Sequence, residues 1–532
     1  MASGVVGRGT WIDKLAGELV RREKRLGRSL GLIRVESGLG ASGIPHIGSL
    51  GDAVRAYGVK LSLEDQGYGS ELVAYADDMD GLRKIPHGFP DSLAKYLAEP
   101  VSAIPDPYGV YESYGARMSG LLLEGLDNLG IRYKFQSAKQ AYGSGLFQRQ
   151  IHAILCSSAS IGQKISEMVG QDKFRNILPY FAVCEKCGRL YTTRSTEYIS
   201  DERVVVYHCG DATVGTTLVA GCGHNGHSKI SRDPGKLAWK VEFAARWQAL
   251  DIRFEAYGKD IMDSVRVNDW RSDNVLAFPH PHHIRYEMFL DRGGKKISKS
   301  SGNVVTPQQW LRYGTPESIL LLLYKRISGA RSVGLEDIPS LMDEYNYLED
   351  IYFKVRATGS REKDIRYRGL YQYANLLRPP KSPGPHIGYR LLVELCRIFY
   401  EERRSRVTSK LIDYGVLQDD SADIGYLIDL AGNYADDFDK LQKTEADIDG
   451  EMAAVLASFA DLLMAADDPA DIQSAIFDVA RSSDVPPRRV FRALYQIILG
   501  TDRGPRLGPF IEDVGRHRVG RLILDRVSSM ID

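Results

Sequence analysis

Two segments of the sequence carry residues that could bind the phosphates of a nucleotide. The first, ESGLGASGIPHIGS (36–49), contains Gly38, Gly40 and Gly43 in the G-x-G-x-x-G spacing of dinucleotide sites, followed by PHIGS. The second, GGKKISKSSGN (293–303), offers lysine ammonium groups and serine hydroxyls on a short loop flanked by glycines. Preorganised cations of this kind stabilise the charge that builds on a leaving pyrophosphate. Together the two segments favour ATP as the ligand.

A dinucleotide site is the first alternative. It requires an acidic residue about 20 positions after the glycines, at the end of the second strand, to bind the ribose hydroxyls. Glu64 lies near that distance but in a segment that is typical of a helix end. Asp77 and Asp78 do end a predicted strand, but they lie too far along the chain. An oxidoreductase is therefore the more remote interpretation.

In the ATP interpretation, PHIGS begins a helix whose first backbone N–H groups attract phosphate. His46 adds a hydrogen-bond donor, and Gly48 leaves room for adenine or ribose against the backbone. The same four letters, PHIG, recur at 385–388, where no strand precedes them and no lysine-rich loop follows. There we predict only a loop and a helix start.

A parallel α/β unit is predicted to position the first segment. Residues 11–30 have helical spacing, 30–37 is an apolar run of strand length, and 71–78 is a second strand after the PHIGS helix. Strand, loop, helix and strand imply a βαβ unit, whose ligands bind beyond the carboxyl ends of the strands. The α/β pattern is predicted to resume at 238–247 and 252–260.

The C-terminal part has a different pattern. Thr306-Pro307 and Thr315-Pro316 predict two helix starts, each with threonine at the N-cap and proline at the first helical position. From about 335 to 532 strand signals fade and helical periodicity dominates. We expect an all-α region there.

Four of the six cysteines fall in one short region, which indicates a metal before a disulfide. A C-x-x-C pair is typical of a zinc knuckle, but GDATVGTTLVAG separates the second pair more widely than usual. His224 or His227 could therefore replace one thiolate or hold a second ion. Structural zinc would hold a β-rich insertion at about 181–232 that is too small to bury a core of its own. The predicted ligands are Cys184, Cys187, Cys209 and Cys222.

The other cysteines and a histidine cluster receive simpler interpretations. Cys156 and Cys396 stand alone in helical, apolar surroundings and are predicted to be core residues. The segment FPHPHHIRYE (278–287) is interpreted as a shaped loop before a strand rather than as a second metal site. Tyr286, near the start of that strand, is predicted to face the ligand pocket.

Length and composition limit the class of protein. A chain of 532 residues is expected to form about three domains. No apolar run approaches the roughly 18 residues of a membrane span, and the N-terminus lacks the apolar core of a secretory signal, so a cytoplasmic location is expected. With 69 basic and 69 acidic residues the net charge is zero and gives no global argument for nucleic acid. Basic clusters occur at 21–28, 401–406, 486–492 and 502–518, and each alone is more simply a solvated helix face.

The two ATP segments and several others resemble the class I lysyl-tRNA synthetases of archaeal type. PHIGS resembles the HIGH motif, and KISKS resembles the KMSKS loop with isoleucine in place of methionine. DDMDGLRKIP, IPDPYGVYESY, CEKCGRLYTT, GKLAWKVEF and FEAYGKD extend the match. The resemblance implies an N-terminal helix (1–30) and a doubly wound parallel-sheet catalytic domain (31–334) with the zinc-binding insertion. It also implies a helical anticodon-binding region (335–532) of one or two subdomains.

The reaction that the resemblance implies has two steps. The carboxylate of lysine attacks the α-phosphate of ATP, used with Mg²⁺, to give lysyl-adenylate and pyrophosphate. The lysyl group then passes to the 3′-terminal ribose of tRNA(Lys). No covalent enzyme intermediate is needed, so catalysis is positioning and charge stabilisation. The implied catalytic residues are His46, Ser49, Lys296 and Lys299; the implied ATP-binding residues are these four with Gly48, Gly258, Asp260, Ser298 and Ser300.

The resemblance also implies an amino-acid pocket that contains Gly38 and Trp239. A desolvated lysine ammonium must be paired. Asp78, Asp80 and Glu112 are the predicted partners, with a local cap or an ion pair to Arg83 or Lys84 as the alternative role of each.

The chain departs from the family pattern at three positions. Ser49 replaces the second histidine of HIGH, Gly40 stands where relatives have threonine, and Ile261 stands where histidine is common. These differences leave the implied function standing but weaken any claim about selectivity against lysine analogues. In the tail, five arginines are predicted to contact tRNA phosphates and two aromatics to stack on bases. They are Arg488, Arg489, Arg492, Arg503, Arg506, Phe491 and Phe510.

Two other functions stay open on the sequence. One is a class I adenylate-forming enzyme for another amino acid or another acceptor, which the long helical tail disfavours. The other is a zinc-bearing, non-catalytic RNA-binding relative, which the retention of both ATP segments disfavours. The sequence does not indicate an oligomeric state.

Overall fold

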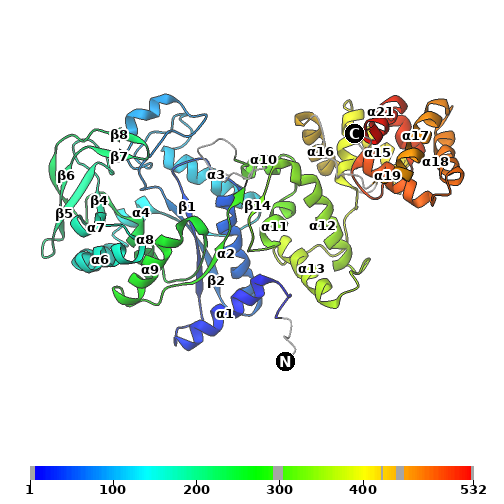
Figure 1. The fold of residues 1–532 in the computed structure, drawn as a ribbon. Helices are drawn as coiled ribbons and strands as arrows, with labels where there is room; N and C mark the ends of the chain where they lie inside the picture. The colour runs from blue at the N-terminus through cyan, green and yellow to red at the C-terminus, as the bar shows by residue number, and fades with distance from the viewer. Residues whose placement is uncertain (1–5, 291–303, 421–422, 439–447, 529–532) are drawn as a thin grey trace. The chain divides into compact units, whose positions relative to one another are not determined.

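The computed structural model describes residues 6–290, 304–420, 423–438 and 448–528 (Figure 1). The chain forms two compact units, of which the first carries the α/β part and the second is helical in its described residues. Unit 1 consists of Met1–Gln309, Ile319–Gly334 and Lys354–Pro379; unit 2 consists of Trp310–Ser318, Leu335–Phe353 and Pro380–Asp532.

A parallel five-stranded sheet of order β12-β11-β1-β2-β3 is the centre of unit 1. The chain builds it outward from β1, first through β2 to β3 and later through β11 to β12. The order in which the chain adds strands therefore reverses between β1 and β11. Parallel sheets bind ligands at such a switch point, beyond the carboxyl ends of the strands. The strands are β1 (Ile33–Gly40), β2 (Ser70–Asp77), β3 (Lys134–Ser137), β11 (Ile252–Gly258) and β12 (His282–Tyr286).

The register of β1 and β2 sets the edge at which the site lies. The two strands pair without interruption, and the last pair is Gly40 beside Asp77. Most residues of both strands are buried, which is typical of a parallel strand covered on both faces. The predicted strands at 30–37 and 71–78 are therefore confirmed, with shifted ends.

Helices connect and cover these strands. Thr10 caps α1 through a reciprocal capping box with Asp13, which fixes where the predicted first helix begins. Helix α2 joins β1 to β2 and is buried along most of its length, so PHIGS does begin a helix after the first strand. The helices of this part are α1 (Trp11–Arg25), α2 (Ile47–Asp65), α3 (Tyr114–Asn128), α4 (Ala138–Gly143), α5 (Gln148–Cys156), α6 (Ser158–Val169), α7 (Lys173–Asn176), α8 (Trp239–Leu250) and α9 (Met262–Asn274), with short 3₁₀ turns at Asp91–Tyr96 and Lys259–Ile261.

Helix α13 (Arg361–Ala374) belongs to unit 1 although it lies far along the sequence. Its Tyr373 is fully buried and donates a hydrogen bond of 2.8 Å from its hydroxyl to Oδ1 of Asp13. Gln372 accepts a bond of 2.8 Å from Nε of Arg8. The helix thus packs on the start of α1.

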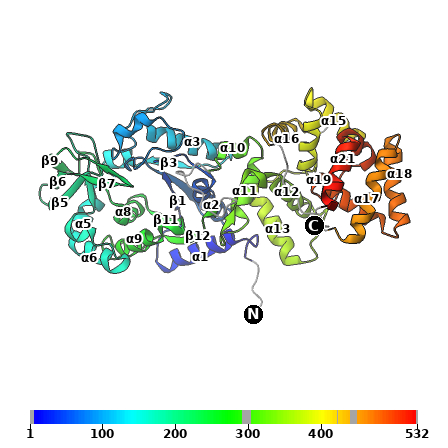
Figure 2. The same cartoon turned by 45° about the horizontal axis from the view of Figure 1, so that its top comes forward.

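The β-rich insertion follows α7 and lies beside α5 and α6 (Figure 2). A three-stranded antiparallel sheet of order β5-β6-β9 forms its centre, with a β7-β8 pair and a β4-β10 pair beside it. Val205 and Tyr207 of β6 pack in one hydrophobic cluster with Val241 and Trp247 of α8, so the insertion does not stand on a core of its own. Its strands are β4 (Tyr180–Ala182), β5 (Thr193–Ile199), β6 (Val204–Cys209), β7 (Ala212–Val214), β8 (Thr217–Val219), β9 (Asn225–Lys229) and β10 (Gly235–Leu237).

The two predicted Thr-Pro helix starts are confirmed. Thr306 Oγ1 accepts from the amide of Gln309 at 3.1 Å, and Thr315 Oγ1 from the amide of Ser318 at 3.4 Å. Beyond residue 335 the described chain contains helices only, as expected. The remaining elements are β13 (Phe289–Leu290), α10 (Pro307–Leu311), α11 (Pro316–Tyr324), β14 (Arg331–Ser332), a 3₁₀ turn at Leu335–Asp337, α12 (Ile338–Tyr352), α14 (Tyr389–Ile398), α15 (Arg403–Asp413), α16 (Gly425–Asp437), α17 (Gly450–Ala465), α18 (Pro469–Ser482), α19 (Pro487–Leu499), α20 (Leu507–Val514) and α21 (Arg516–Ser528).

Two predictions about single side chains are wrong. Cys156 is exposed, because α5 turns Ile151 and Leu155 toward the core and ends at the cysteine; Cys396 is buried as expected. Phe510 is fully buried against Tyr414, at 5.9 Å between ring centroids, so it is not available for stacking on a base. In the described part of the chain, no helix is long and apolar enough to cross a membrane.

Candidate active site

A cavity of about 320 Å³ lies beyond the carboxyl ends of β1, β11 and β12. It includes the switch point between β1 and β11, where the order in which the chain adds strands reverses. Residues predicted for two different ligands, ATP and an amino acid, meet in its wall. They are Gly38, His46, Gly48, Ser49, Trp239, Gly258, Asp260 and Tyr286.

His46 is the N-cap of α2. Its Nδ1 accepts a hydrogen bond of 3.3 Å from the backbone amide of Ser49, which turns the imidazole toward the cavity wall. A Cβ atom on Gly48 would lie 2.7 Å from Cε1 of His46, so only glycine leaves the ring in this position. PHIGS therefore places an imidazole, a hydroxyl and the positive end of a helix dipole together, a combination suited to phosphate.

Tyr286 ends β12 rather than beginning a strand, and it lines the cavity as predicted. Arg55 of α2 lies behind it, with the guanidinium carbon 4.2 Å from the centre of the tyrosine ring. Burial lowers the pKa of Arg55 to about 10, partly offset by Asp52. A buried cation over an aromatic face fixes the ring in place.

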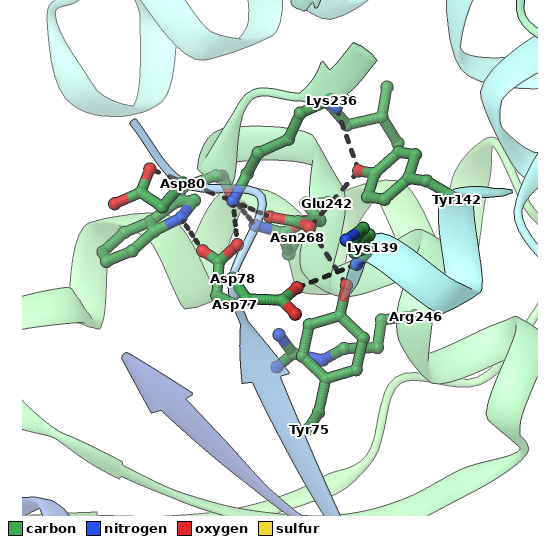
Figure 3. A network of polar contacts seen from close by, with 12 residues as sticks. Tyr75, Asp77, Asp78, Asp80, Lys139, Tyr142, Lys236, Glu242, Arg246 and Asn268 are labelled. Atoms are coloured by element: carbon green, nitrogen blue, oxygen red, sulfur yellow. Dashed lines mark hydrogen bonds and ion pairs between the residues drawn. The ribbon is translucent and has the colours of Figure 1, made fainter. Parts of the chain in front are cut away.

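Asp77, the last residue of β2, lines the cavity and contacts two other side chains (Figure 3). Its Oδ2 accepts a hydrogen bond of 2.7 Å from the indole Nε1 of Trp239. Its Oδ1 forms an ion pair with the ammonium of Lys236, which belongs to β10 and is 2% exposed. Asp77 thus connects the sheet edge with the wall that Trp239 forms.

Lys236 is the centre of a buried cluster of opposite charge (Figure 3). Its Nζ lies 3.2 Å from Oε2 of Glu242 and 3.9 Å from Oδ1 of Asp80. Burial opposes the charge of the ammonium, but the carboxylates of Asp77 and Glu242 outweigh it and raise the pKa of Lys236. Burial also raises the pKa of Glu242 to about 7, although Lys236 acts against that shift.

The predicted ammonium partners lie elsewhere. Asp78 accepts bonds from Ser137 Oγ at 2.6 Å and from the amide of Lys139 at 2.8 Å, and burial raises its pKa. Asp80 accepts from the hydroxyl of Tyr191, and Glu112 is exposed before α3. The described residues that line the cavity include none of these three carboxylates, whose role toward a substrate stays a prediction.

A second buried ion cluster forms another part of the cavity wall. Arg246 of α8 contacts Glu36 of β1 at 2.5 Å and Glu255 of β11 at 2.9 Å. Burial raises the pKa of Glu36 to about 8. The guanidinium lies 3.6 Å from the Cβ position of Gly38, so this glycine leaves the space above Arg246 open to the cavity.

A larger cavity of about 720 Å³ lies between the insertion and the sheet domain of unit 1. Trp239 borders both cavities. Burial lowers the pKa of Lys173, and Arg194 and Arg83 add to that shift, so the cations of this cavity repel one another. Its wall includes Arg83, Lys173, Arg194, Lys236 and Lys240 and the aromatic residues Phe174, Phe181, Tyr191 and Trp239.

The four predicted zinc ligands lie together. Cys184, Cys187, Cys209 and Cys222 place their sulfurs within 4.8 Å of one another. Two of the separations are 3.6 Å and 3.7 Å, close to the roughly 3.8 Å between sulfurs around tetrahedral zinc with Zn–S bonds of about 2.3 Å. His224, the alternative ligand, bonds instead with Glu185 through Nε2 at 2.7 Å.

The histidines of 278–287 are paired with acids. His280 contacts Asp273 at 2.8 Å and His283 contacts Asp269 at 2.9 Å. The described residues form one cluster suited to a metal ion, the four cysteines, and the second alternative ligand, His227, does not belong to it.

The second ATP segment lies outside the described residues, with Lys296, Ser298, Lys299 and Ser300. Sequence reasoning did not predict that Asp77 and Arg246 line the smaller cavity, or that Lys236 lines the larger one. Asp77 carried a signal, since it ends a strand beside the glycine loop. Lys236 and Arg246 carried none that could be distinguished from a surface charge.

Comparison with known proteins shows the family of the chain. Residues 9–376 match the family described as tRNA synthetases class I (K). A lysine–tRNA ligase from Cenarchaeum symbiosum is 62% identical over 98% of this chain and 99% of its own, and one from Rickettsia bellii is 30% identical over 93% and 94%. A solved glutamate tRNA ligase from Elizabethkingia meningosepticum aligns over 93% of this chain and 99% of its own, with 12% identity and a TM-score of 0.35. The chain belongs to the class I (K) tRNA synthetase family.

Proposed function

We propose that the chain is a lysine–tRNA ligase, which activates lysine with ATP and transfers it to the 3′ end of tRNA(Lys). Two observations support the assignment: the family match, and the relatives of that name that cover nearly the whole chain. The observation in the structure that carries it is one shared cavity. The cap of α2 and the wall residues predicted for an amino acid face the same space of about 320 Å³.

The activation step follows from the residues at the helix cap. The positive N-terminal end of α2, with the side chains of His46 and Ser49, would bind the phosphates of ATP and its Mg²⁺ complex. Gly258 and Asp260, at the end of β11, would bind the ribose. Lys296 and Lys299 would stabilise the pyrophosphate as it leaves. No nucleophilic side chain is required, because the carboxylate of the amino acid attacks the α-phosphate directly.

The charge of the cavity favours an amino acid with a cationic side chain. Four carboxylates line the cavity, those of Asp52, Asp77, Glu255 and Asp260, and carboxylates outnumber cations there even though Asp77 is paired with Lys236 and Glu255 with Arg246. Such a wall attracts an ammonium ion and disfavours an acidic side chain. We therefore place the lysine side chain against this wall.

Gly40 and Ile261, two of the three positions where the chain differs from the family pattern, both line the cavity. Gly40 lacks the hydroxyl of threonine, and Ile261 lacks the ring nitrogens of histidine, so each removes a polar contact from the wall. Discrimination against close analogues such as ornithine would then depend on cavity shape and charge.

The larger cavity is suited to the 3′ end of the tRNA. Cations and aromatic rings together bind single-stranded nucleic acid, through phosphate contacts and base stacking.

In unit 2, Arg488, Arg503 and Arg506 are exposed, while Arg489 is paired with Asp449. Phosphate contacts by the exposed arginines would make the affinity for tRNA fall as the salt concentration rises. The compartment of translation, the cytoplasm, is where we place the protein.

The cysteine cluster would hold structural zinc. Its four thiolates have the separations and the closed set of ligands that structural zinc prefers. One zinc ion per chain is expected by metal analysis. Chelation should lower the melting temperature of the native protein and have no such effect on Cys209→Ser. Metal-free protein of unchanged stability would refute this role.

ATP–pyrophosphate exchange with each of the twenty amino acids, with and without bulk tRNA, tests the proposed function. Exchange confined to lysine supports it. Exchange with another amino acid would keep the family and overturn the substrate. RNA binding without any exchange would indicate the non-catalytic relative.

A further inference from the structure

The buried lysine beside the amino-acid cavity has no role in the chemistry proposed above. Lys236 is 2% exposed, and burying an ammonium is costly unless it is paired. Replacing such a cluster with apolar side chains would often be neutral or stabilising. A purely structural role therefore gives no reason for placing a lysine here.

The contacts of Lys236 lead to the cavity wall. Its ammonium is paired with Oδ1 of Asp77, and Oδ2 of the same carboxylate accepts the indole N–H of Trp239 at 2.7 Å. Both oxygens of Asp77 thus have a donor, one on β10 and one on α8. The orientation of the carboxylate is fixed from both sides, and the indole follows it.

Trp239 is the first residue of α8 and is half-buried. Its ring lies 6.1 Å from that of Phe243 and 5.5 Å from the guanidinium of Arg83, and Asp77 fixes its N–H edge. It borders both cavities, so its position sets the size of the amino-acid cavity. A ring that swings away would open that cavity toward the larger one.

We propose that Lys236 is a positioning residue for the amino acid: it holds Asp77, and through Asp77 the indole of Trp239, as the wall of the lysine cavity. The inference rests on the proposed function, since it assigns the amino acid to this cavity. Lys236 itself does not line the amino-acid cavity, so it acts on the lysine substrate only through Asp77 and Trp239.

Steady-state exchange kinetics of three variants test the proposal. Lys236→Met removes the ammonium, Asp77→Asn leaves one acceptor oxygen for two donors, and Trp239→Phe keeps a ring without the N–H. Each should raise KM for lysine by about tenfold, the size expected for one lost hydrogen bond to a charged group, and leave KM for ATP within about twofold. Unchanged KM for lysine in Lys236→Met would overturn the proposal, as would a parallel rise in both KM values.

A double-mutant cycle separates positioning from general damage. Lys236→Met and Asp77→Asn act on the same contact, so the double variant should show about the KM of the worse single variant. Multiplied effects would mean that the two residues act independently, and would contradict the inference. If Lys236→Met does not fold, Lys236→Gln takes its place in the cycle. Glutamine keeps an N–H donor but not the charge, so a smaller rise in KM for lysine is expected.

Lys60→Met is the matched control. Lys60 is also a mostly buried lysine with one carboxylate partner, Glu64 at 2.8 Å, but it lies near the C-terminal end of α2. It should leave both KM values unchanged. The native protein is measured first: failure to exchange lysine would refute the proposed function, whereas normal KM values in Lys236→Met would refute only the positioning role.

Discussion

The tetrapeptide Pro-His-Ile-Gly occurs twice in the chain, and the two copies have different surroundings. At 45–48 it follows a parallel strand, caps α2 with its histidine and lines a cavity. At 385–388 it precedes α14, and its histidine contacts the carboxylates of Glu349 and Asp350, the latter at 2.9 Å. The same residues thus present an imidazole to a cavity in one place and cross-link helical structure in the other. The sheet edge, rather than the four letters, makes the first copy a candidate site.

The strongest test of this contrast replaces each histidine with asparagine. Asparagine is a good N-cap, so His46→Asn keeps the start of α2 while removing the imidazole. We expect the exchange rate to fall by about 10²–10³, as for other preorganised donors to a developing charge. His386→Asn should stay within about twofold of the native rate.

Equal losses in both histidine variants would mean that the helical region affects activation as much as the cavity does, and the contrast would fail. Thermal unfolding of both variants shows whether the fold is intact.

The glycines give a second, smaller contrast. A methyl group on Gly48 would lie 2.7 Å from the His46 ring, whereas at Gly388 the nearest heavy atom lies 4.0 Å away. Gly48→Ala should displace the imidazole and reduce exchange by about 10–100-fold, since small misplacements have effects of this order. Gly388→Ala should be nearly silent, with a change in unfolding free energy within about 0.5 kcal/mol. A fully active Gly48→Ala would show that the ring position seen here is not required.

The pH dependence of stability gives the smallest effect. The hydrogen bond to Glu349 raises the pKa of His386 above its usual 6.5. A group whose pKa is raised by folding adds stability below its unfolded pKa, and that stability is lost as pH rises through the folded-state pKa. The melting temperature of the native protein should therefore exceed that of His386→Asn most at about pH 6, and the gap should shrink toward about pH 9. A gap that widens with pH would contradict the contact.

The sequence predicted elements well wherever local chemistry decides them. Thr306 and Thr315 cap their helices because hydroxyl and proline act within one turn. The cysteine spacing predicted the cluster, and the strand ends predicted the sheet edge at which the cavity lies. Side-chain direction was harder. Asp78 follows Asp77 directly, yet Asp78 bonds with Ser137 and Asp77 with Lys236 and Trp239.

That difference depends on partners from distant segments. Lys236 reaches Asp77 across 159 positions of sequence, and no periodicity near either residue signals the pair. The predictions that Cys156 is buried and that Phe510 is exposed for stacking were wrong for a related reason. Which face of a helix is covered depends on the neighbour that packs there. The lysines of KISKS stay predictions, since they lie outside the described residues.

The return of α13 to unit 1 limits where the chain can be divided. A catalytic fragment ending at residue 334 would leave the Asp13 carboxylate without the hydroxyl of Tyr373 and would uncover the surface on which that tyrosine is fully buried. A fragment extended to residue 379 contains the whole of unit 1, together with two segments of unit 2, Trp310–Ser318 and Leu335–Phe353. For protein engineers who wish to exchange the helical C-terminal region between synthetases, a joint at residue 334 should therefore yield unstable chimaeras, because it removes α13 from unit 1.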